Sequence, residues 1–177
     1  MAAFLIVKPD RGDSTSGQEL SGDLSISDAM EFEEFELYWV GGEIAGLPIT
    51  HIIHRTSRNS VSFSYGDCES TTEESGCALP LTVIVEPTCT RREVTPDGID
   101  GGERGEMRGV PVRDLKNGTV VIWTQDVTVL IAVPAGESPV DPLDAVNSLT
   151  KVGTRDDSTE APADLPQPDF SACGRSG

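Results

Sequence analysis

The chain has 177 residues, which at about 150 residues per domain suits one domain with extensions and excludes a multidomain assembly. Hydrophobic residues make up 37% of the chain, so its core is expected to be small. With 30 acidic and 13 basic residues the formal net charge is −17, which repels phosphate backbones, so no nucleic-acid partner is expected. No apolar run approaches the roughly 20 residues that cross a bilayer, and no membrane span is expected.

The N-terminal segment, residues 1–36, is predicted to be acidic and largely flexible. It holds 9 acidic and 2 basic residues, and its polar stretch at 8–28 has few side chains able to bury area against the entropy of ordering. Residues 1–7 are apolar but have neither a preceding basic residue nor a small-residue cleavage site, so no signal peptide is predicted. Phe32 and Phe35 lie among four glutamates, which favours a solvated acidic face. If this segment orders on binding, the two phenylalanines would contact a protein partner with a basic surface.

Residues 37–152 are predicted to form a single domain built mainly of short strands. At residues 61–65 apolar and polar side chains alternate strictly, which is typical of a half-buried strand. The clearest hairpin lies between Val120 and Val133 and is expected at the centre of the sheet. Asn117-Gly118, just before it, favours a type I′ turn, in which both central residues have positive φ. The other expected strands are bounded by turn signals, and they lie at residues 37–40, 49–55, 81–85 and 107–112.

One helix is expected, after the last strand. Asp141 is a favourable N-cap, Pro142 suits the first helical position, and Gly153 is predicted to end the helix. Three apolar side chains on one helix face would cover a side of the sheet, and they are Leu143, Val146 and Leu149. The expected fold is therefore α+β, a mainly antiparallel sheet of about five to six strands with one C-terminal helix packed on a face. Residues 153–177 are predicted to be an acidic, Pro-containing tail.

The four cysteines are Cys68, Cys77, Cys89 and Cys173. Cys68 and Cys77 bracket a loop rich in Ser, Thr and Glu, and a disulfide between them would stabilise the fold by roughly 2–3 kcal/mol on chain-entropy grounds. A zinc site is disfavoured, because no C-x-x-C pair or histidine at ligand spacing accompanies these thiols. Cys89 and Cys173 either form a second disulfide that holds the tail, or leave Cys89 as a buried thiol and Cys173 free.

Several short motifs carry a resemblance to a known group. They are YWVG at residues 38–41, GLPIT at 46–50, YGDC at 65–68 with GC at 76–77, and PTCTR at 87–91. Together with RGVP at residues 108–111, they make the chain similar to uncharacterised exported or lipoprotein-like bacterial proteins over about residues 37–150. The resemblance implies an extracytoplasmic domain with a cysteine-closed loop and no activity that can be transferred. The chain departs from this group in lacking an export signal and a lipid-attachment cysteine near its start.

No residue pattern points firmly to catalysis or to a cofactor. His51 and His54 lie in a predicted strand, where residues three apart face opposite sides and cannot share a metal. Asp97, Asp100 and Glu103 are weak metal candidates, because their acidic loop is similar to a calcium loop but fails its register. We therefore expect a non-enzymatic, extracytoplasmic binding or assembly domain with a protein partner. The alternative is a small hydrolase or a calcium-dependent module that uses the acidic loop at residues 97–106.

Overall fold

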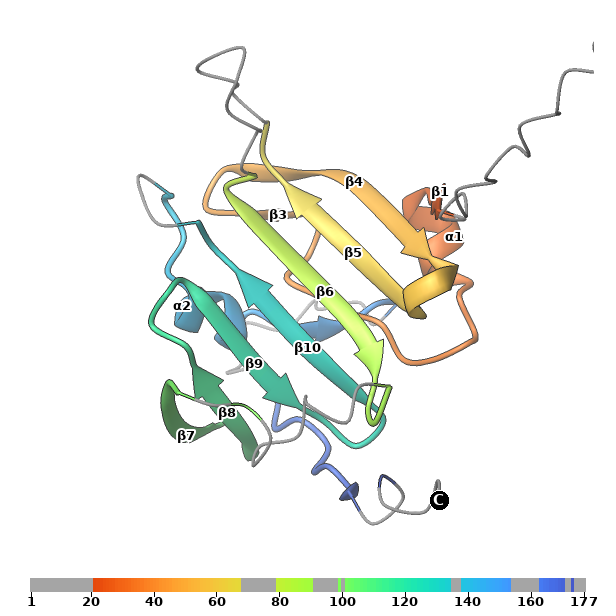
Figure 1. Ribbon diagram of the computed structural model, residues 1–177. Coiled ribbons are helices and arrows are strands. Elements are labelled where there is room, and N and C mark those ends of the chain that lie inside the picture. The colour runs from red at the N-terminus through yellow and green to blue at the C-terminus, as the bar shows by residue number, and fades with distance from the viewer. Residues whose placement is uncertain are drawn as a thin grey trace, which may run out of the picture.

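The computed structural model of the chain describes residues 21–67, 79–90, 99, 101–134, 138–153, 163–170 and 173. The described residues form a nine-stranded antiparallel sheet of order β1-β4-β5-β6-β10-β9-β8-β7, with β3 paired to β4 (Figure 1). A separate two-stranded sheet pairs β2 with β11. The strands are β1 (Ser21–Asp23), β2 (Tyr38–Trp39), β3 (Glu43–Ile44), β4 (Leu47–Arg55), β5 (Ser60–Tyr65), β6 (Leu81–Pro87), β7 (Glu103–Met107), β8 (Val110–Asp114), β9 (Thr119–Trp123), β10 (Val127–Ala132) and β11 (Thr150–Lys151). The helices are α1 (Ile26–Met30), α2 (Pro142–Asn147) and the 3₁₀ turn η1 (Thr56–Arg58).

The mainly antiparallel sheet is confirmed, but its nine strands exceed the five to six that the sequence predicted. The additional strands are short or lie at the sheet edge, and they lack the alternation that identifies a half-buried strand. β7 is almost entirely exposed along its length, and β3 has only two residues. The predicted hairpin between Val120 and Val133 is β9 and β10, and β10 pairs with β6 at the centre of the sheet, as expected.

The core lies on one face of this sheet. Val61, Phe63 and Tyr65 of β5 are fully buried, and they pair across the sheet with Val85, Val83 and Leu81 of β6. α2 covers this face behind β9 and β10 (Figure 1), where Val146 and Leu149 are buried. We call this side of the sheet the core face.

The helix prediction needs three corrections. α2 begins as expected, since the Asp141 side chain accepts a hydrogen bond from the Leu143 N–H at 2.7 Å. However, α2 ends at Asn147 rather than near Gly153, because Thr150 and the following residue pair with β2 to form β11. Leu143 is 36% exposed, so it does not share the buried face of the helix. A second helix, α1, forms where Ser25 and Asp28 make a reciprocal capping box.

The turn before the central hairpin also differs from its prediction. Positive φ occurs at Lys116 and Gly118 but not at Asn117. The Asn117-Gly118 pair therefore does not form the centre of a type I′ turn. The Asn117 side chain instead accepts a hydrogen bond from the Thr119 N–H at 3.1 Å. Gly118 has φ of 82°, and the Val133 N–H donates to its carbonyl at 2.7 Å. The close approach of that neighbouring backbone leaves no room for a side chain at Gly118.

Parts of both terminal segments belong to the fold. β1 pairs with β4, and Ala29 of α1 is 2% exposed. Near the other end, the Leu165 N–H donates to the Arg108 carbonyl at 2.8 Å, and the Leu165 side chain is buried. A disulfide joins Cys89 to Cys173, whose Cα atoms are 5.1 Å apart, which is the first of the two alternatives considered for these cysteines. Among the described residues, no helix has the length and hydrophobicity needed to cross a membrane.

Candidate functional site

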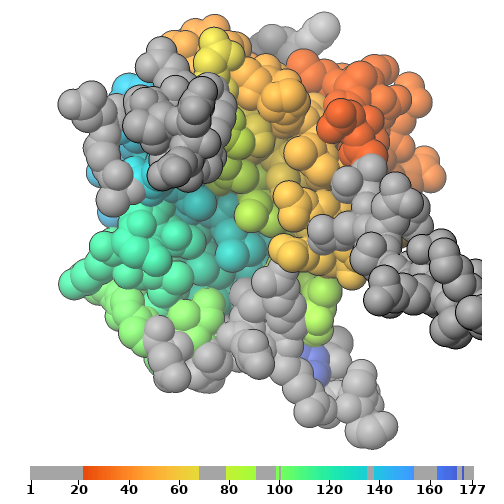
Figure 2. Space-filling view, turned by 45° about the horizontal axis from the view of Figure 1, so that its top comes forward, coloured from red at the N-terminus to blue at the C-terminus, as the bar shows by residue number. Residues whose placement is uncertain are grey.

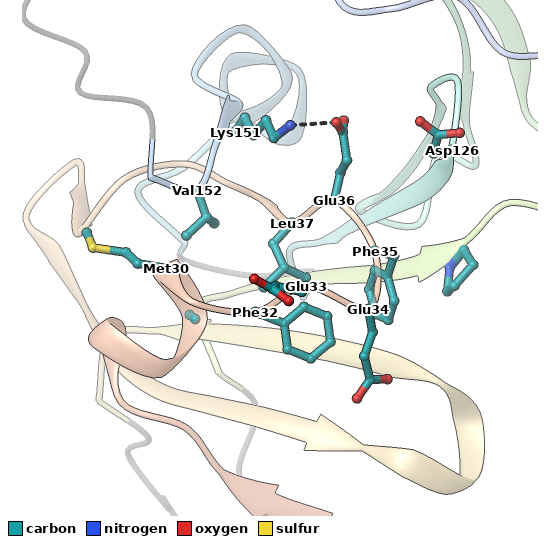
Figure 3. Close-up of a pocket in the computed structure, with 12 residues that line it drawn as sticks. Met30, Phe32, Glu33, Glu34, Phe35, Glu36, Leu37, Asp126, Lys151 and Val152 are labelled. Atoms are coloured by element: carbon teal, nitrogen blue, oxygen red, sulfur yellow. Dashed lines mark hydrogen bonds and ion pairs between the residues drawn. The ribbon is translucent and has the colours of Figure 1, made fainter.

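The main candidate site is a cavity of about 570 Å³ beside the end of α1 (Figure 3). Its lining comes from four separate parts of the chain: the stretch from α1 to β2, the end of β6, the β9–β10 turn, and β11. We call it the acidic cavity, and its lining residues are Ala29, Met30, Phe32, Glu33, Glu34, Phe35, Glu36, Leu37, Pro87, Asp126, Lys151 and Val152.

Backbone and side-chain contacts hold the acidic stretch of this cavity in place. Leu37 is 3% exposed, and its carbonyl accepts a hydrogen bond from the Val152 N–H at 2.9 Å. Just beyond it, the Tyr65 hydroxyl donates to the Gly41 carbonyl at 3.0 Å and accepts from the Val40 N–H at 3.3 Å. Burial raises the pKa of the Tyr65 phenol above its usual value, so the hydroxyl stays protonated and keeps donating. The stretch that carries the glutamates is therefore anchored at its C-terminal end to the core.

Aromatic side chains form the apolar part of the cavity. The rings of Phe32 and Phe35 meet edge to face with centroids 4.9 Å apart, and both side chains are half-buried. Phe32 also meets the His54 ring edge to face at 5.2 Å. Met30, at the rim, is 54% exposed. The structure thus brings Phe32 and Phe35, the two residues that the sequence named for partner contact, to one opening, while their role in binding stays a prediction.

Carboxylates dominate the charge of the cavity. Lys151 pairs with Glu36 at 2.5 Å, and the Tyr38 hydroxyl donates to the other Glu36 oxygen at 3.1 Å. The hydrogen bond from Lys151 holds the pKa of Glu36 below its usual range, so this carboxyl is ionised at neutral pH. The remaining acidic lining residues, Glu33, Glu34 and Asp126, are exposed. Among the described lining residues, one cation therefore faces four carboxylates, so this part of the opening is negative.

The two histidines lie on opposite sides of the sheet, as their spacing predicts. In the β4–β5 register His54 faces Val61 of the core face, whereas His51 faces Ser64 of the other face. The His54 Nε2 atom lies 3.8 Å from a Glu34 oxygen, and the described residues provide it with no hydrogen-bond partner. His54 therefore packs against Phe32, which lines the acidic cavity.

The predicted metal and disulfide residues are covered only in part. Cys68, Cys77, Asp97 and Asp100 lie outside the described residues, so their predicted roles stay predictions. Glu103 is at the start of β7, where it pairs with Lys116 at 3.3 Å. Within the described part of the chain, no three His, Cys, Asp or Glu side chains gather as a metal site requires. The hydrolase or calcium-dependent alternative for residues 97–106 likewise stays a prediction.

Sequence reasoning missed most of the cavity wall. Pro87, Asp126 and Lys151 had no local signal of function, because each lies at a strand end or turn far along the chain from Phe32. The β6–β10 pairing brings two of them together, since the Thr88 N–H donates to the Asp126 carbonyl at 2.9 Å. Only the position of Asp126 in the turn of the predicted hairpin was available from the sequence.

Comparison with known proteins places the chain in no established group. No family model, curated protein or solved structure matches it. The resemblance to exported or lipoprotein-like bacterial proteins therefore stays a prediction that rests on the short motifs.

Proposed function

We propose that the protein is a non-enzymatic, extracytoplasmic binding domain whose acidic cavity receives a cationic segment of a protein partner. The observation that carries this proposal is that half-buried Phe32 and Phe35 share one opening with the exposed carboxylates of Glu33, Glu34 and Asp126. An apolar side chain of the partner would bury against the aromatic edges, and a neighbouring Lys or Arg would meet the carboxylates.

The apolar contact supplies most of the affinity, and the carboxylates supply selectivity. Burying one Leu- or Phe-sized side chain contributes roughly 1.5–3 kcal/mol, whereas an exposed ion pair contributes about 0–1 kcal/mol. The carboxylates accelerate the approach of a basic partner and repel an acidic one, and this effect weakens as salt is added. The acidic cavity thus suits a basic segment that carries at least one apolar anchor.

The disulfide between Cys89 and Cys173 supports the extracytoplasmic part of the proposal. Disulfides form and persist in oxidising compartments and are rare where glutathione and thioredoxin keep thiols reduced. The resemblance to exported bacterial proteins implies the same compartment. Mass analysis of protein isolated without reductant from its native host tests this part, since alkylation of Cys89 and Cys173 in that material would contradict it.

The binding part is tested by titrating the oxidised full chain with two synthetic peptides of equal length. One peptide alternates Lys and Leu, and in the other each Lys is replaced by Glu. We expect only the Lys peptide to bind, with an affinity that falls as salt is added. E33Q/E34Q should weaken this binding at least threefold, because it removes two charges from the opening.

Matched variants separate the cavity from the overall charge. E43Q/E106Q removes the same charge at exposed sites outside the cavity lining and should change the affinity less than twofold. M30S should weaken binding more than L143S, which changes another exposed apolar residue outside the cavity. Equal losses in both charge variants, or no binding of the Lys peptide at low salt, would show that the acidic cavity is not the binding site.

A further inference from the structure

A second cavity, of about 270 Å³, lies on the face of the sheet opposite the core face. It runs across β4, β5 and β6, whose side chains on this side reach the surface in orange, yellow and yellow-green in Figure 2. We call it the serine recess, and its lining residues are Ile53, Arg55, Arg58, Ser60, Ser62, Ser64, Leu79, Thr82 and Ile84.

The serines of this recess are mostly buried, and their hydroxyls line it without a hydrogen bond to the described residues. The alternation at residues 61–65 predicts a solvated polar side for β5, yet Ser60, Ser62 and Ser64 are only 2%, 9% and 4% exposed. In the part of the chain that the structure describes, their hydroxyls make no side-chain hydrogen bond, and each serine lines the recess. None of these hydroxyl oxygens is among the fully buried, unpaired polar atoms of the described residues, so they reach the space of the recess. A row of donors is therefore available to a ligand.

Cationic side chains lie at one end of the row. Arg55 is opposite Ser60 in the β4–β5 register, and Arg58 follows in η1. Among the described residues Arg55 has no ion pair, and the described lining contains no carboxylate. Glu86 is on the same side of β6 but is 1% exposed and does not line the recess. The described lining of the recess therefore combines hydroxyls with the half-buried guanidinium of Arg55, in a chain whose net charge is −17.

From this arrangement we infer that the serine recess is a binding site for a small molecule that carries a phosphate or sulfate group. Guanidinium groups and hydroxyls are the side chains that bind such oxyanions, through charge-assisted and neutral hydrogen bonds respectively. Opposed residues in an antiparallel sheet have Cβ atoms about 4.5–5.5 Å apart, so the oxyanion can meet Arg55 and the neighbouring hydroxyls together. The apolar floor of Ile53 and Ile84 would contact the carbon skeleton of the ligand.

The size of the recess limits its ligand. Pockets that hold drug-sized molecules measure about 300–1,000 Å³, and the recess is slightly smaller, at about 270 Å³. It therefore suits a ligand with one ring or a short chain. It lies across the sheet from the acidic cavity, so this inference does not depend on the proposed protein partner.

The test is a titration of the oxidised, isotope-labelled full chain followed by amide NMR. The probes are inorganic phosphate, inorganic sulfate, and glucose 6-phosphate with glucose as the uncharged comparison, all at an ionic strength held constant with sodium chloride. We expect saturable changes in the amide signals of β4, β5 and β6 with phosphate, sulfate or both. Glucose 6-phosphate should bind more tightly than these anions, and glucose should cause no change in the signals. Binding of glucose 6-phosphate no tighter than that of both inorganic anions would contradict a site for an organic ester.

Variants locate the binding. R55Q should weaken it about tenfold or more, as expected for a lost charge-assisted hydrogen bond. K116Q, which changes the net charge equally at an exposed site outside the recess, should change it less than twofold. The double variant S62A/S64A should weaken binding about threefold or more compared with the exposed control pair S27A/S148A. If R55Q fails to fold, this comparison tests the inference in its place. Absence of saturation at about 50 mM of every charged probe, or equal losses in R55Q and K116Q, would overturn the inference.

Discussion

Removing the disulfide between Cys89 and Cys173 should lower the free energy of unfolding by about 4.5 kcal/mol. The two cysteines are 84 residues apart, and closing a loop of this length in the unfolded chain removes the corresponding entropy from that state. This value is near the upper end of the measured losses for native disulfides, which run from about 2 to 5 kcal/mol. In a chain of this size the same loss lowers Tm by roughly 10–15 °C.

The variant is C89S/C173S, compared with the oxidised wild type by urea unfolding and calorimetry. Cys89 is exposed and Cys173 half-buried, so the substitutions themselves remove little packing. T90S, an exposed change in the same turn, serves as the control and should be within about 0.5 kcal/mol of the wild type. The tail keeps its contact between Leu165 and Arg108 in the folded state, whereas the slope of the urea transition should increase, because the unfolded chain without the cross-link exposes more surface. A loss below about 1 kcal/mol would refute the reasoning from loop closure.

Three further predictions concern the anchors around the acidic cavity and the central turn. Y65F removes a buried hydroxyl that bonds the backbone twice, and it should lower the free energy of unfolding by about 1–2 kcal/mol in urea. Since Lys151 lowers the pKa of Glu36 in the folded state, their pair stabilises the fold above the ordinary Glu pKa of 4.5 and loses this effect as pH falls through the lowered value. K151M should therefore flatten the decline of stability between about pH 5 and pH 3, and an unchanged pH profile would contradict this. G118A should unfold at least about 1 kcal/mol more readily than G46A, since both glycines have positive φ but only Gly118 has a backbone carbonyl where the methyl group would lie.

Periodicity predicted the strands that pack on the core and missed those at the edges. Residues 61–65 and 120–133 have apolar side chains at every second position or in continuous runs, and both form central strands. β7 contains a glycine and three charged residues, so its backbone pairing with β8 has no hydrophobic signature. Edge strands of this kind are held by backbone hydrogen bonds to the neighbouring strand. A local sequence pattern does not reveal such bonds.

The predicted end of the C-terminal helix was wrong because a long-range strand pairing ends the helix early. From Pro142 the apolar spacing continues as far as Leu149, and a local reading extends the helix to the glycine at 153. Thr150 instead pairs with Trp39 of β2, more than a hundred residues earlier in the chain. This pairing also places Lys151 beside Glu36. One long-range strand pair thus both shortens α2 and completes the acidic cavity.

The serine side of β5 shows why alternation alone gives an incomplete account of function. Strict alternation of Val61, Ser62, Phe63 and Ser64 correctly predicts a strand with one apolar face. It does not say whether the polar face is solvated, and here that face is buried. The hydroxyls of this largely buried face make no hydrogen bond to the described residues and open onto the recess instead. The signal for the serine recess is therefore the combination of sequence pattern and burial.

The main sheet separates two sites of opposite charge. Glu33, Glu34 and Asp126 open on the side that carries the core, whereas Arg55 lines a recess on the opposite side. A cationic segment and an oxyanion would neutralise each other if they approached one surface, but the sheet keeps them apart. Because added salt weakens exposed charge interactions most, binding at the exposed carboxylates of the acidic cavity should lose more affinity with salt than binding at half-buried Arg55 of the serine recess. Titrating the Lys peptide and inorganic phosphate at two salt concentrations measures both losses, and equal losses would contradict this division.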